Sequence, residues 1–574
     1  MNELNKLGKV LTTDVLVIGA GLGGMLTALK LKKLDKSIDV LCIEKNYHGY
    51  TGQSTKAGHG FFYMSPKDDI DEFCKQQIEI NNLGMYLNDQ EYMYETVREG
   101  YTYVDELQKL GGVFAHNEDG SLYYHKEFDA KKSSGINTDL DDNVAYTNEA
   151  LKNGVRIMER MYFTDLLTEG GRVIGAVGFH LDTLEFHIFR AKAVVLAANA
   201  FSPCVSAMFY TPATPTIAAY EAGAQLRNAE QATYCDLCRR NTKDDIYGAM
   251  GIIFNKKGEN LFQKYNSQDF ENIDIALMRG MYNEVKEGNY PLYVDFSKLP
   301  KMETGETEGE GFHMGMIMPL RVEMNEELSG GDANYHINPE VSVGMYVYSE
   351  SLRVDIDTKT TIPNLYGVGT IGMYGSAYGG WVHGEGVGYA CRTGLRAART
   401  IAPVIADIEL GEVSTEQVKA FKERIYAPFN FKGNDLPFQI VHYLDRLVMS
   451  PENSLFRTEE SIHNVLNILK EMRDNLESSI YVPEGDGHHL AKAIEARAAI
   501  DMLEIMYMAY DTRKESRGFH TRVDYPERDD KNWLKWIVVN KGEDGSPNLT
   551  FERIPFERYK WKPEGWTPDW NPAE

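Results

Sequence analysis

The segment DVLVIGAGLGG, residues 14–24, limits the possible folds of this chain more than any other segment. Its apolar start is typical of a buried strand, its Gly-x-Gly-x-x-Gly pattern is typical of a tight turn, and apolar side chains at helical spacing follow from Met25. A second apolar run, 40–43, ends at Glu44, twenty residues after Gly24. This order of strand, glycine turn, helix, strand and acid predicts a parallel βαβ unit that binds a dinucleotide.

The three glycines of this turn, Gly19, Gly21 and Gly24, have separate physical roles. They allow a tight turn, a close approach of the backbone to a pyrophosphate, and close packing of helix on strand. The turn opens at a helix N-terminus, whose free N–H groups and dipole favour an anion. Glu44 stands where such folds place the acid that binds the adenosine ribose.

The composition excludes several other classes of protein. Of 574 residues, 43% are hydrophobic and 25% charged, as in soluble globular proteins. A formal net charge of −25 disfavours a nucleic-acid partner, because an acidic surface repels phosphates. Six scattered cysteines fit a reducing compartment. No signal-peptide core and no run approaching ~18 apolar residues occur, so we expect a cytoplasmic protein without a membrane span.

The pattern along the chain indicates several folding units. Strand-like runs give way after Thr211 to short elements with polar insertions, resume near Leu352, and yield to helical periodicity beyond Thr415. We expect strands at 172–177, 193–198, 352–355 and 362–369, helices at 415–424, 454–477 and 488–509, and surface loops at 303–310 and 325–334.

These units predict an α/β protein with four parts. They are a Rossmann-like nucleotide-binding domain (1–213 and 341–402), an inserted α+β capping domain (214–340), a helical bundle (403–512) and an extended C-terminal tail (513–574). The tail is charged and aromatic, and we expect it to drape over another core rather than build its own.

The order of these elements resembles the flavoprotein subunit of the fumarate reductase and succinate dehydrogenase superfamily, which includes the alpha subunit of adenylylsulfate reductase. The resemblance covers nearly the whole chain. Besides the first glycine turn it rests on STKAGHG (54–60), NGVRIMER (153–160), GRVIGAVGF (171–179), AVVLAAN (193–199), IPNLYGVG (362–369) and ESRGFHTRVDYPERDDKNW (515–533). The last of these is the most specific.

The resemblance implies an FAD-dependent oxidoreductase. The cofactor would be held by Gly19, Gly21, Gly24, Glu44, Lys45, Ser54, Thr55, Ala57, Gly58, Gly60, Ala198, Gly369, Thr370, Glu385 and Gly386. Membrane-bound members tether FAD through the histidine of an S-H-T-x-x-A-x-G-G motif, and Gln53 stands at that position here. We therefore expect noncovalent FAD.

Three departures from the family narrow the chemistry. Ala377 stands where fumarate-handling members carry the arginine of H-G-A-N-R-L-G-G, Asp274 stands where they carry the proton-donating arginine, and residues 341–344 lack their substrate histidine. Fumarate is therefore not the expected substrate. The turn VHGEG, 382–386, and the extension after the tail motif are instead similar to adenylylsulfate reductase.

Several side chains are candidates for catalysis. We expect His383, Trp381, Tyr378 and Tyr346 near the flavin, because aromatic side chains with a polar tip gather in these segments. Arg279 and His336 are candidates for an acid or anion clamp from the capping domain. A lone Cys235-x-x-Cys238 and the pair His488-His489 are interpreted as structural, and we predict no metal site.

The leading functional hypothesis is a reductase that transfers hydride from flavin N5 to an activated C=C bond of an enone or enoate. The chain shows no second dinucleotide-binding unit and no cysteine cluster for iron–sulfur, so electrons are expected from a separate donor, an iron–sulfur, ferredoxin-like subunit being one candidate. Two alternatives stay open. One is an adenylylsulfate-reductase-like subunit that acts on a sulfur oxyanion with an iron–sulfur partner, and the other is an electron-transfer subunit without its own substrate.

Overall fold

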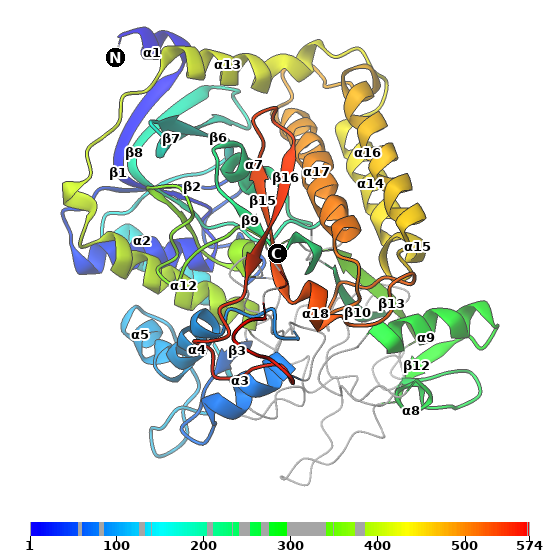
Figure 1. Cartoon of the computed structure of the whole chain (residues 1–574). Coiled ribbons are helices and arrows are strands. Elements are labelled where there is room, and N and C mark those ends of the chain that lie inside the picture. The colour runs from blue at the N-terminus through cyan, green and yellow to red at the C-terminus, as the bar shows by residue number, and fades with distance from the viewer. Residues whose placement is uncertain are drawn as a thin grey trace, which may run out of the picture.

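The computed structural model describes residues 2–55, 60–79, 85–124, 133–138, 141–203, 210–231, 233–239, 253–265, 275–295, 340–347, 349, 351–373, 385–570 and 572. Figure 1 shows the main sheet at the upper left, long helices at the upper right and a smaller lobe with α8 and α9 at the lower right. The expected loops at 303–310 and 325–334 lie outside the described residues.

The largest sheet is built on the predicted βαβ unit. Its strands run in the order β5-β2-β1-β8-β7-β6, and β14 also pairs with β8. The strands are β1 (Lys9–Ile18), β2 (Val40–Ile43), β5 (Arg156–Met158), β6 (Met161–Glu169), β7 (Arg172–His180), β8 (Phe186–Leu196) and β14 (Leu365–Gly367). β5, β2, β1, β8 and β14 pair in parallel, and β6 and β7 are antiparallel. The carboxyl ends of β1, β2 and β8 therefore meet at one edge.

Alternate residues of β1 belong to two different cores. Val15 and Val17 pack with α2 (Leu22–Leu34) and α12 (Glu385–Ile401) on one face. Leu16 and Ile18 pack on the other face with a cluster that includes α7 (Thr214–Glu221) and α17 (Gly487–Thr512). A strand buried on both faces is nearly continuous in apolar side chains, as DVLVI is.

The inserted segment has its own sheet and core. Its antiparallel strands follow the order β10-β13-β12-β11, with β10 (Thr233–Arg239), β11 (Ile253–Phe254), β12 (Leu292–Val294) and β13 (Glu340–Val347). α8 (Leu261–Lys264) and α9 (Ile275–Lys286) pack on this core, and Leu455 of the helical region joins it.

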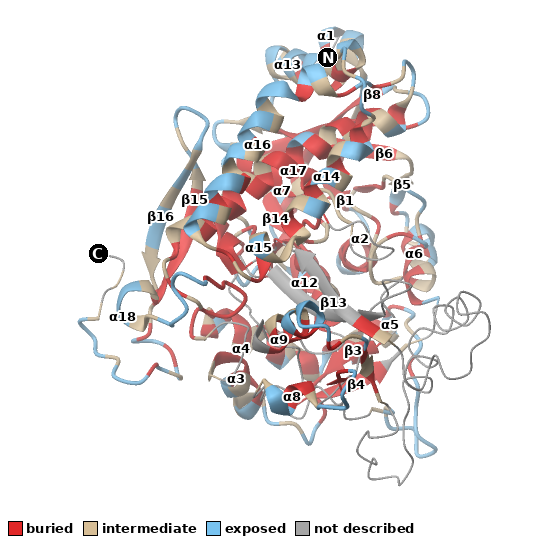
Figure 2. Ribbon diagram, turned by 90° about the vertical axis from the view of Figure 1, so that its right-hand side faces the viewer, coloured by how far each residue is buried: buried red, intermediate tan, exposed pale blue. Residues whose placement is uncertain are grey.

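The helical region contains two helices that the sequence pattern does not predict. The helices are α13 (Thr415–Tyr426), α14 (Pro437–Met449), α15 (Pro451–Ser454), α16 (Glu459–Ser479) and α17. The unexpected helices are α14 and the four-residue α15, although each has a proline in its first turn, a common start signal. The helix expected from 454 begins five residues later, because Thr458 caps it by accepting a hydrogen bond from the Ser461 N–H. Figure 2 shows α17 as a mostly buried helix.

The tail is more regular than the sequence indicates. β15 (Lys535–Lys541) and β16 (Pro547–Arg553) form a hairpin, and β15 also pairs with β9 (Leu226–Arg227), which makes a three-stranded sheet. Trp561, Trp566 and Trp570 then pack against a cluster that includes Phe62 and Tyr92. The prediction of draping is therefore incomplete, because the tail also adds two strands to the body.

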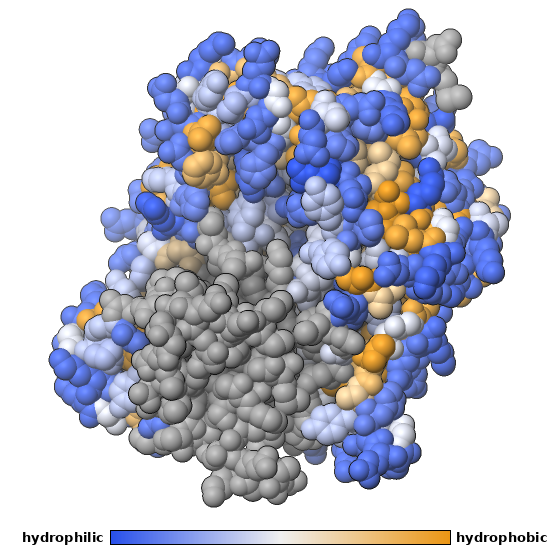
Figure 3. All heavy atoms as spheres, turned by 180° about the vertical axis from the view of Figure 1, so that it is seen from behind, coloured by the Kyte–Doolittle hydropathy of each residue, from blue (hydrophilic) through white to orange (hydrophobic). Residues whose placement is uncertain are grey.

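The remaining described elements are short. They are α1 (Asn2–Leu7), β3 (Gly60–Tyr63), α3 (Ile70–Glu79), α4 (Gln90–Arg98), the 3-10 turn Glu99–Tyr101, α5 (Tyr103–Lys109), β4 (Ser134–Asn137), α6 (Asp142–Lys152) and α18 (Asp530–Trp533). Within the described ranges, no helix combines the length and apolar character needed to span a bilayer. Seen from behind, the described surface is mainly hydrophilic, with apolar side chains in small groups (Figure 3).

Candidate cofactor site and its surroundings

The glycine turn has the geometry that the sequence predicts. Gly19 has a φ of +108°, and a Cβ there would lie 2.4 Å from the Ala197 carbonyl oxygen. A Cβ on Gly24 would lie 2.0 Å from the Gly19 oxygen. Around Gly21 the nearest atom to a Cβ is the Gly52 Cα, at 3.7 Å. Two glycines thus close the turn, and the third leaves an open cradle at the N-terminus of α2, which fits a pyrophosphate.

Glu44 links this turn to the end of β2. Its Oε2 accepts the Ala20 N–H at 2.8 Å, and its Oε1 accepts the Asn46 N–H at 2.8 Å and the Thr51 hydroxyl at 3.0 Å. The side chain is 5% exposed. A carboxylate oxygen has about two acceptor positions, so one on Oε2 remains for the predicted ribose contact.

The segment after Glu44 folds back over the turn. Gly52 has a φ of +93°, and its carbonyl accepts the Thr55 hydroxyl at 2.9 Å. Gly52 lies against Gly21, and Ser54 follows in the same turn. Ala57 and Gly58 lie outside the described residues, and Gly60 begins β3, opposite Asn137.

A second glycine turn lies beside the first. Residues 367–372 repeat the Gly-x-Gly-x-x-Gly pattern, but they lead into the 3-10 turn Thr370–Gly372 rather than a helix. Gly369 has a φ of +78°, and its N–H donates to the Thr393 hydroxyl of α12 at 3.0 Å. The Thr370 hydroxyl accepts the Ala200 N–H at 3.1 Å, which brings this turn next to Ala198 at the end of β8.

The start of α12 carries a buried ion pair. The Arg392 Nη2 lies 2.5 Å from the Glu385 Oε1, and both side chains are 0% exposed. The Arg392 guanidinium also lies 4.9 Å from the ring centroid of Phe62. Glu385 and Gly386 thus occupy the first turn of α12, whose N–H groups and dipole suit a partly anionic ligand.

Lys45 contacts the helical region. Its Nζ lies 3.8 Å from the Oε1 of Glu495, which is buried in α17 and also bonds Lys492 and Tyr210, each at 2.6 Å. Burial alone would raise the pKa of Glu495, but Lys45 and Lys492 outweigh it, so the pKa lies below its ordinary value. Lys45, next to the predicted ribose ligand Glu44, therefore joins two parts of the chain.

The predicted catalytic residues are only partly described. His383, Trp381, Tyr378 and His336 lie outside the described residues, and the backbone of Tyr346 in β13 pairs with Tyr234. The Arg279 Nε donates to the Leu455 carbonyl oxygen at 2.8 Å, and its guanidinium lies 5.4 Å from the Phe456 ring centroid. Arg279 thus joins α9 to the helical region.

Two further candidates have structural surroundings. Cys235 and Cys238 lie three residues apart in β10, in register with Met345 and Ser342. At about 3.3 Å per residue their Cα atoms are too far apart for a disulfide. Asp486 caps α17 by accepting the His489 N–H at 3.0 Å and contacts its ring at 2.7 Å, which is a structural role for this part of the histidine pair.

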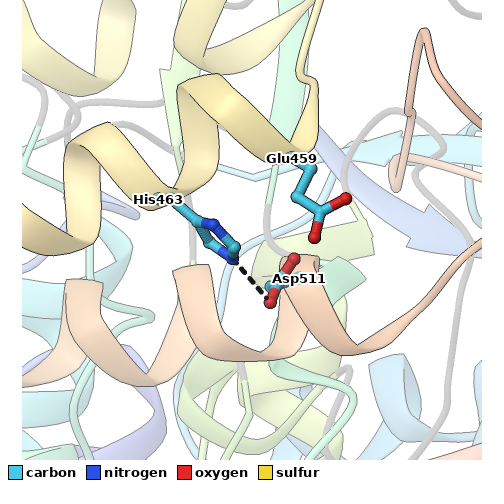
Figure 4. Close-up of side chains that lie close together, drawn as sticks. All are labelled: Glu459, His463 and Asp511. Atoms are coloured by element: carbon cyan, nitrogen blue, oxygen red, sulfur yellow. Dashed lines mark hydrogen bonds and ion pairs between the residues drawn. The ribbon is translucent and has the colours of Figure 1, made fainter.

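One surface cluster has the residue types of a metal site. Glu459, His463 and Asp511 lie close together on α16 and α17, and the His463 ring bonds Asp511 at 3.0 Å (Figure 4). The other carboxylate oxygen of Asp511, Oδ1, lies 3.0 Å from the Lys514 Nζ and 3.8 Å from the Arg522 Nη1. These two positively charged side chains would repel a metal cation at the same carboxylate. The ion pairs therefore account for this cluster.

Sequence reasoning missed two groups of buried polar residues. One joins α4 to α12, where Tyr92 and Tyr389 share a hydrogen bond of 2.5 Å. The other is the set of arginines at the start of the tail, of which Arg513 and Arg517 are completely buried. The available signal was the spacing of 385, 389, 392 and 396, which repeats on one helix face.

Comparison with known proteins agrees with this site. The family model described as FAD binding domain matches residues 14–389, and the one described as fumarate reductase flavoprotein C-term matches residues 446–566. A fumarate reductase (CoM/CoB) subunit from Methanothermobacter marburgensis is 23% identical over 556 residues, covering 92% of this chain and 97% of the relative. The flavoprotein subunit of 8-methylmenaquinol:fumarate reductase from Wolinella succinogenes is 23% identical over 584 residues, covering 95% and 91%.

Solved structures have the same fold. A quinol fumarate reductase structure from E. coli matches with a TM-score of 0.80 and 18% identity, covering 95% of this chain and 97% of that chain. Adenylylsulfate reductase from Archaeoglobus fulgidus matches with a TM-score of 0.73 and 17% identity, covering 95% and 96%. The predicted α/β fold with a Rossmann-like FAD-binding domain is thereby confirmed.

Proposed function

The chain belongs to the flavoprotein family of fumarate reductases and succinate dehydrogenases, which are FAD-dependent oxidoreductases, and from this premise we propose that it reduces an activated C=C bond. The bound FAD supplies a hydride, and the proposed acceptor is an enone or enoate. The chain binds and orients both partners and provides a proton for the second carbon.

The observation that carries this proposal is the loss of dicarboxylate-binding groups within an otherwise matching family member. Ala377 and Asp274 stand at the positions of two arginines, and the strand segment 341–344 of β13 carries no histidine. A carboxylate moved out of water without a cationic partner loses several kcal/mol of binding. A substrate with a single activating group is therefore a better fit than fumarate.

The binding groups of the chain have distinct roles in this proposal. Glu44 accepts a ribose hydroxyl, the open cradle at Gly21 admits the pyrophosphate, and the N-terminus of α12 favours negative charge at the flavin end. His383, Trp381, Tyr378 and Tyr346 line the substrate position, and Arg279 or His336 approaches from the inserted domain.

Electrons come from a separate protein or reduced carrier, for which an iron–sulfur, ferredoxin-like subunit is our first candidate. The alternative function, action on a sulfur oxyanion, is favoured by the turn VHGEG at 382–386. A subunit that only transfers electrons is the third possibility, and a substrate-sized cavity at the flavin would count against it.

One anaerobic experiment separates these functions. The protein with its FAD is reduced and then mixed with enones, enoates, fumarate or adenylylsulfate, while flavin reoxidation is recorded. We expect fast reoxidation by an enone or enoate and a rate with fumarate lower by orders of magnitude. Efficient use of fumarate, with kcat/KM near ~10⁵ M⁻¹s⁻¹, would contradict the proposal. Reoxidation by adenylylsulfate alone would favour the alternative.

The attachment of FAD is tested separately. With Gln53 in the place of the tethering histidine, acid precipitation should release all yellow colour into the supernatant as FAD. Flavin that stays with the pellet would contradict noncovalent binding.

A further inference from the structure

One face of α12 is polar although it is buried. Glu385, Tyr389, Arg392, Arg396 and Arg399 follow each other at steps of four, three, four and three residues, which places them on a single helix face. The first four are at most 7% exposed. Apolar side chains would pack there at lower cost, since burying charged groups requires them to be paired.

α4 and the 3-10 turn that follows it lie beside α12 (Figure 1), and polar side chains from both bond this face of α12. The Tyr92 and Tyr389 hydroxyls share a hydrogen bond of 2.5 Å. The Arg396 Nη2 donates to the Glu99 Oε2 at 2.5 Å and to the Thr96 hydroxyl at 3.3 Å. We call these paired faces the α4–α12 seam; it consists of Glu385, Tyr389, Arg392, Arg396, Tyr92, Thr96 and Glu99.

The two ends of the seam have different surroundings. At one end a surface pocket of about 480 Å³ is lined by Glu95, Glu99, Arg396 and Arg399 among others. The Glu99 side chain is 24% exposed, so water reaches the seam there.

The other end of the seam lies beside the cofactor site. α12 crosses α2 so closely that a Cβ on Gly394 would lie 2.5 Å from the Gly23 oxygen, and Thr393 bonds the turn at Gly369. α12 begins at Glu385, nine residues before Gly394. Measured along the helix axis, Glu385 lies about 13 Å from Gly394, on the same side of the proposed cofactor site.

We propose that the α4–α12 seam conducts protons from the surface pocket to the flavin end of α12, an inference that rests on the proposed reductase function. Each turnover requires two electrons from the separate donor and two protons from water. One proton enters with the electrons when the cofactor is reduced. The other goes to the substrate carbon that does not receive the hydride, so the C=C bond becomes a CH–CH bond.

The side chains of the seam have different roles in this proton path. Glu99 takes a proton at the pocket, the Tyr92 and Tyr389 hydroxyls, which share one hydrogen bond, pass it on because a hydroxyl can both accept and donate, and Glu385, one helical turn before Tyr389, receives it at the far end. Between Glu99 and Tyr92 the path includes the Thr96 hydroxyl and a water molecule.

The arginines position these groups and carry no proton themselves. Burial lowers the pKa of Arg396, but Glu99 and Tyr92 outweigh it and hold the pKa above its ordinary value. Arg392 holds Glu385, and Arg399 contacts Glu99 and Glu106 at the solvent end. A further ionisable neighbour, Tyr103, donates to the Phe62 carbonyl oxygen and lies off the path.

The test is the reduction of the FAD-loaded protein by dithionite in a stopped-flow instrument, followed by loss of the yellow absorbance. We expect Tyr389→Phe to slow this reduction at least about tenfold, as the loss of a proton-transfer group does. The solvent isotope effect should rise, and added imidazole, a small proton carrier, should restore the rate. Tyr103→Phe also removes a buried hydroxyl and should react at the wild-type rate.

A wild-type rate for Tyr389→Phe with full FAD content would overturn the proposal, and so would a slow rate that imidazole leaves unchanged. If Tyr389→Phe does not fold, Glu99→Gln serves instead, because it changes one atom at the solvent end. It should show the same slowing and rescue, and a wild-type rate would overturn the proposal. Since this reaction needs no acceptor, its result is independent of the acceptor screen that tests the proposed function.

Discussion

Two buried polar networks in this protein differ in how they end. In the tail, Arg513 bonds Glu230 and Glu515, and Arg517 bonds the same Glu515; these four side chains are completely buried. The α4–α12 seam also pairs buried arginines with carboxylates, but it opens into a surface pocket. Similar residues can thus fasten three parts of a chain together where the network is closed, and can exchange protons where it is open.

The largest expected effect concerns the closed network. Arg517→Met should lower the free energy of unfolding by about 3–5 kcal/mol, because it leaves Glu515 buried with less compensation. Urea unfolding followed by tryptophan fluorescence measures this, since five of the six tryptophans lie in the tail. Arg528→Met is the matched control. Arg517 also contacts Asp530 at 2.7 Å, and Arg528 pairs with this Asp530 from a partly exposed position, so Arg528→Met should change stability by about 0.5 kcal/mol or less. Equal losses would erase the distinction between buried and exposed pairs.

The contrast between closed and open sites recurs within the glycine turn. Gly21→Ala should leave the unfolding free energy nearly unchanged, since its Cβ meets nothing closer than 3.7 Å, yet weaken FAD binding at least about tenfold by filling the cradle. Titration of apoprotein with FAD measures this. Gly24→Ala, whose Cβ would lie 2.0 Å from the Gly19 oxygen, should instead lose folded protein. Unchanged FAD affinity in Gly21→Ala would place the pyrophosphate elsewhere.

The closed network also predicts a dependence on pH. Burial, with Arg457, Arg513 and Arg522 nearby, lowers the pKa of His520 well below its ordinary value. In the unfolded chain the His520 imidazole therefore binds a proton near pH 6.5, whereas in the folded chain it stays neutral at this pH. This contribution to stability is present above pH 6.5 and is lost as the pH falls below it, by up to about 1.4 kcal/mol per pH unit. His520→Gln should flatten that part of the stability curve, and a curve of unchanged slope would contradict this.

The smallest expected effect concerns the α4–α12 seam, the network that opens to the surface. Glu99→Gln should cost about 1 kcal/mol of unfolding free energy or less, because its carboxylate is partly solvated and water can replace the lost pairing. The same urea experiment measures it. A loss as large as that of Arg517→Met would make the seam a structural network like the tail.

Features fixed by local backbone chemistry could be predicted from the sequence. A Cβ would clash at positions 19 and 24, so only glycine fits there. Glu44 is recognised from its distance along one βαβ unit. Each of these features can therefore be read from a short segment of sequence. The strand 40–43 matches β2 residue for residue for the same reason.

Features that depend on distant partners could not be predicted. β15 is a strand because β16 and β9 pair with it, and its partner in β9 lies far away in the sequence. Arg396 sits on a helix like a solvated arginine, and it is internal because Glu99, Thr96 and the Ile356 carbonyl oxygen, all from other segments, bond it. Helix α14 was missed although Pro437 marks its start.

The pairing of β15 with β9 has a consequence for synthesis of the protein. β9 has no strand partner from β15 until a segment about 310 residues later in the chain has been made, and the Trp536 indole also donates to the Leu87 carbonyl oxygen, 449 residues earlier in the chain. Joining such remote segments is slow, because the intervening chain must first lose its freedom. The three-stranded sheet can therefore form only after β15 has been synthesised, which leaves an interval in which FAD can bind before this sheet is complete.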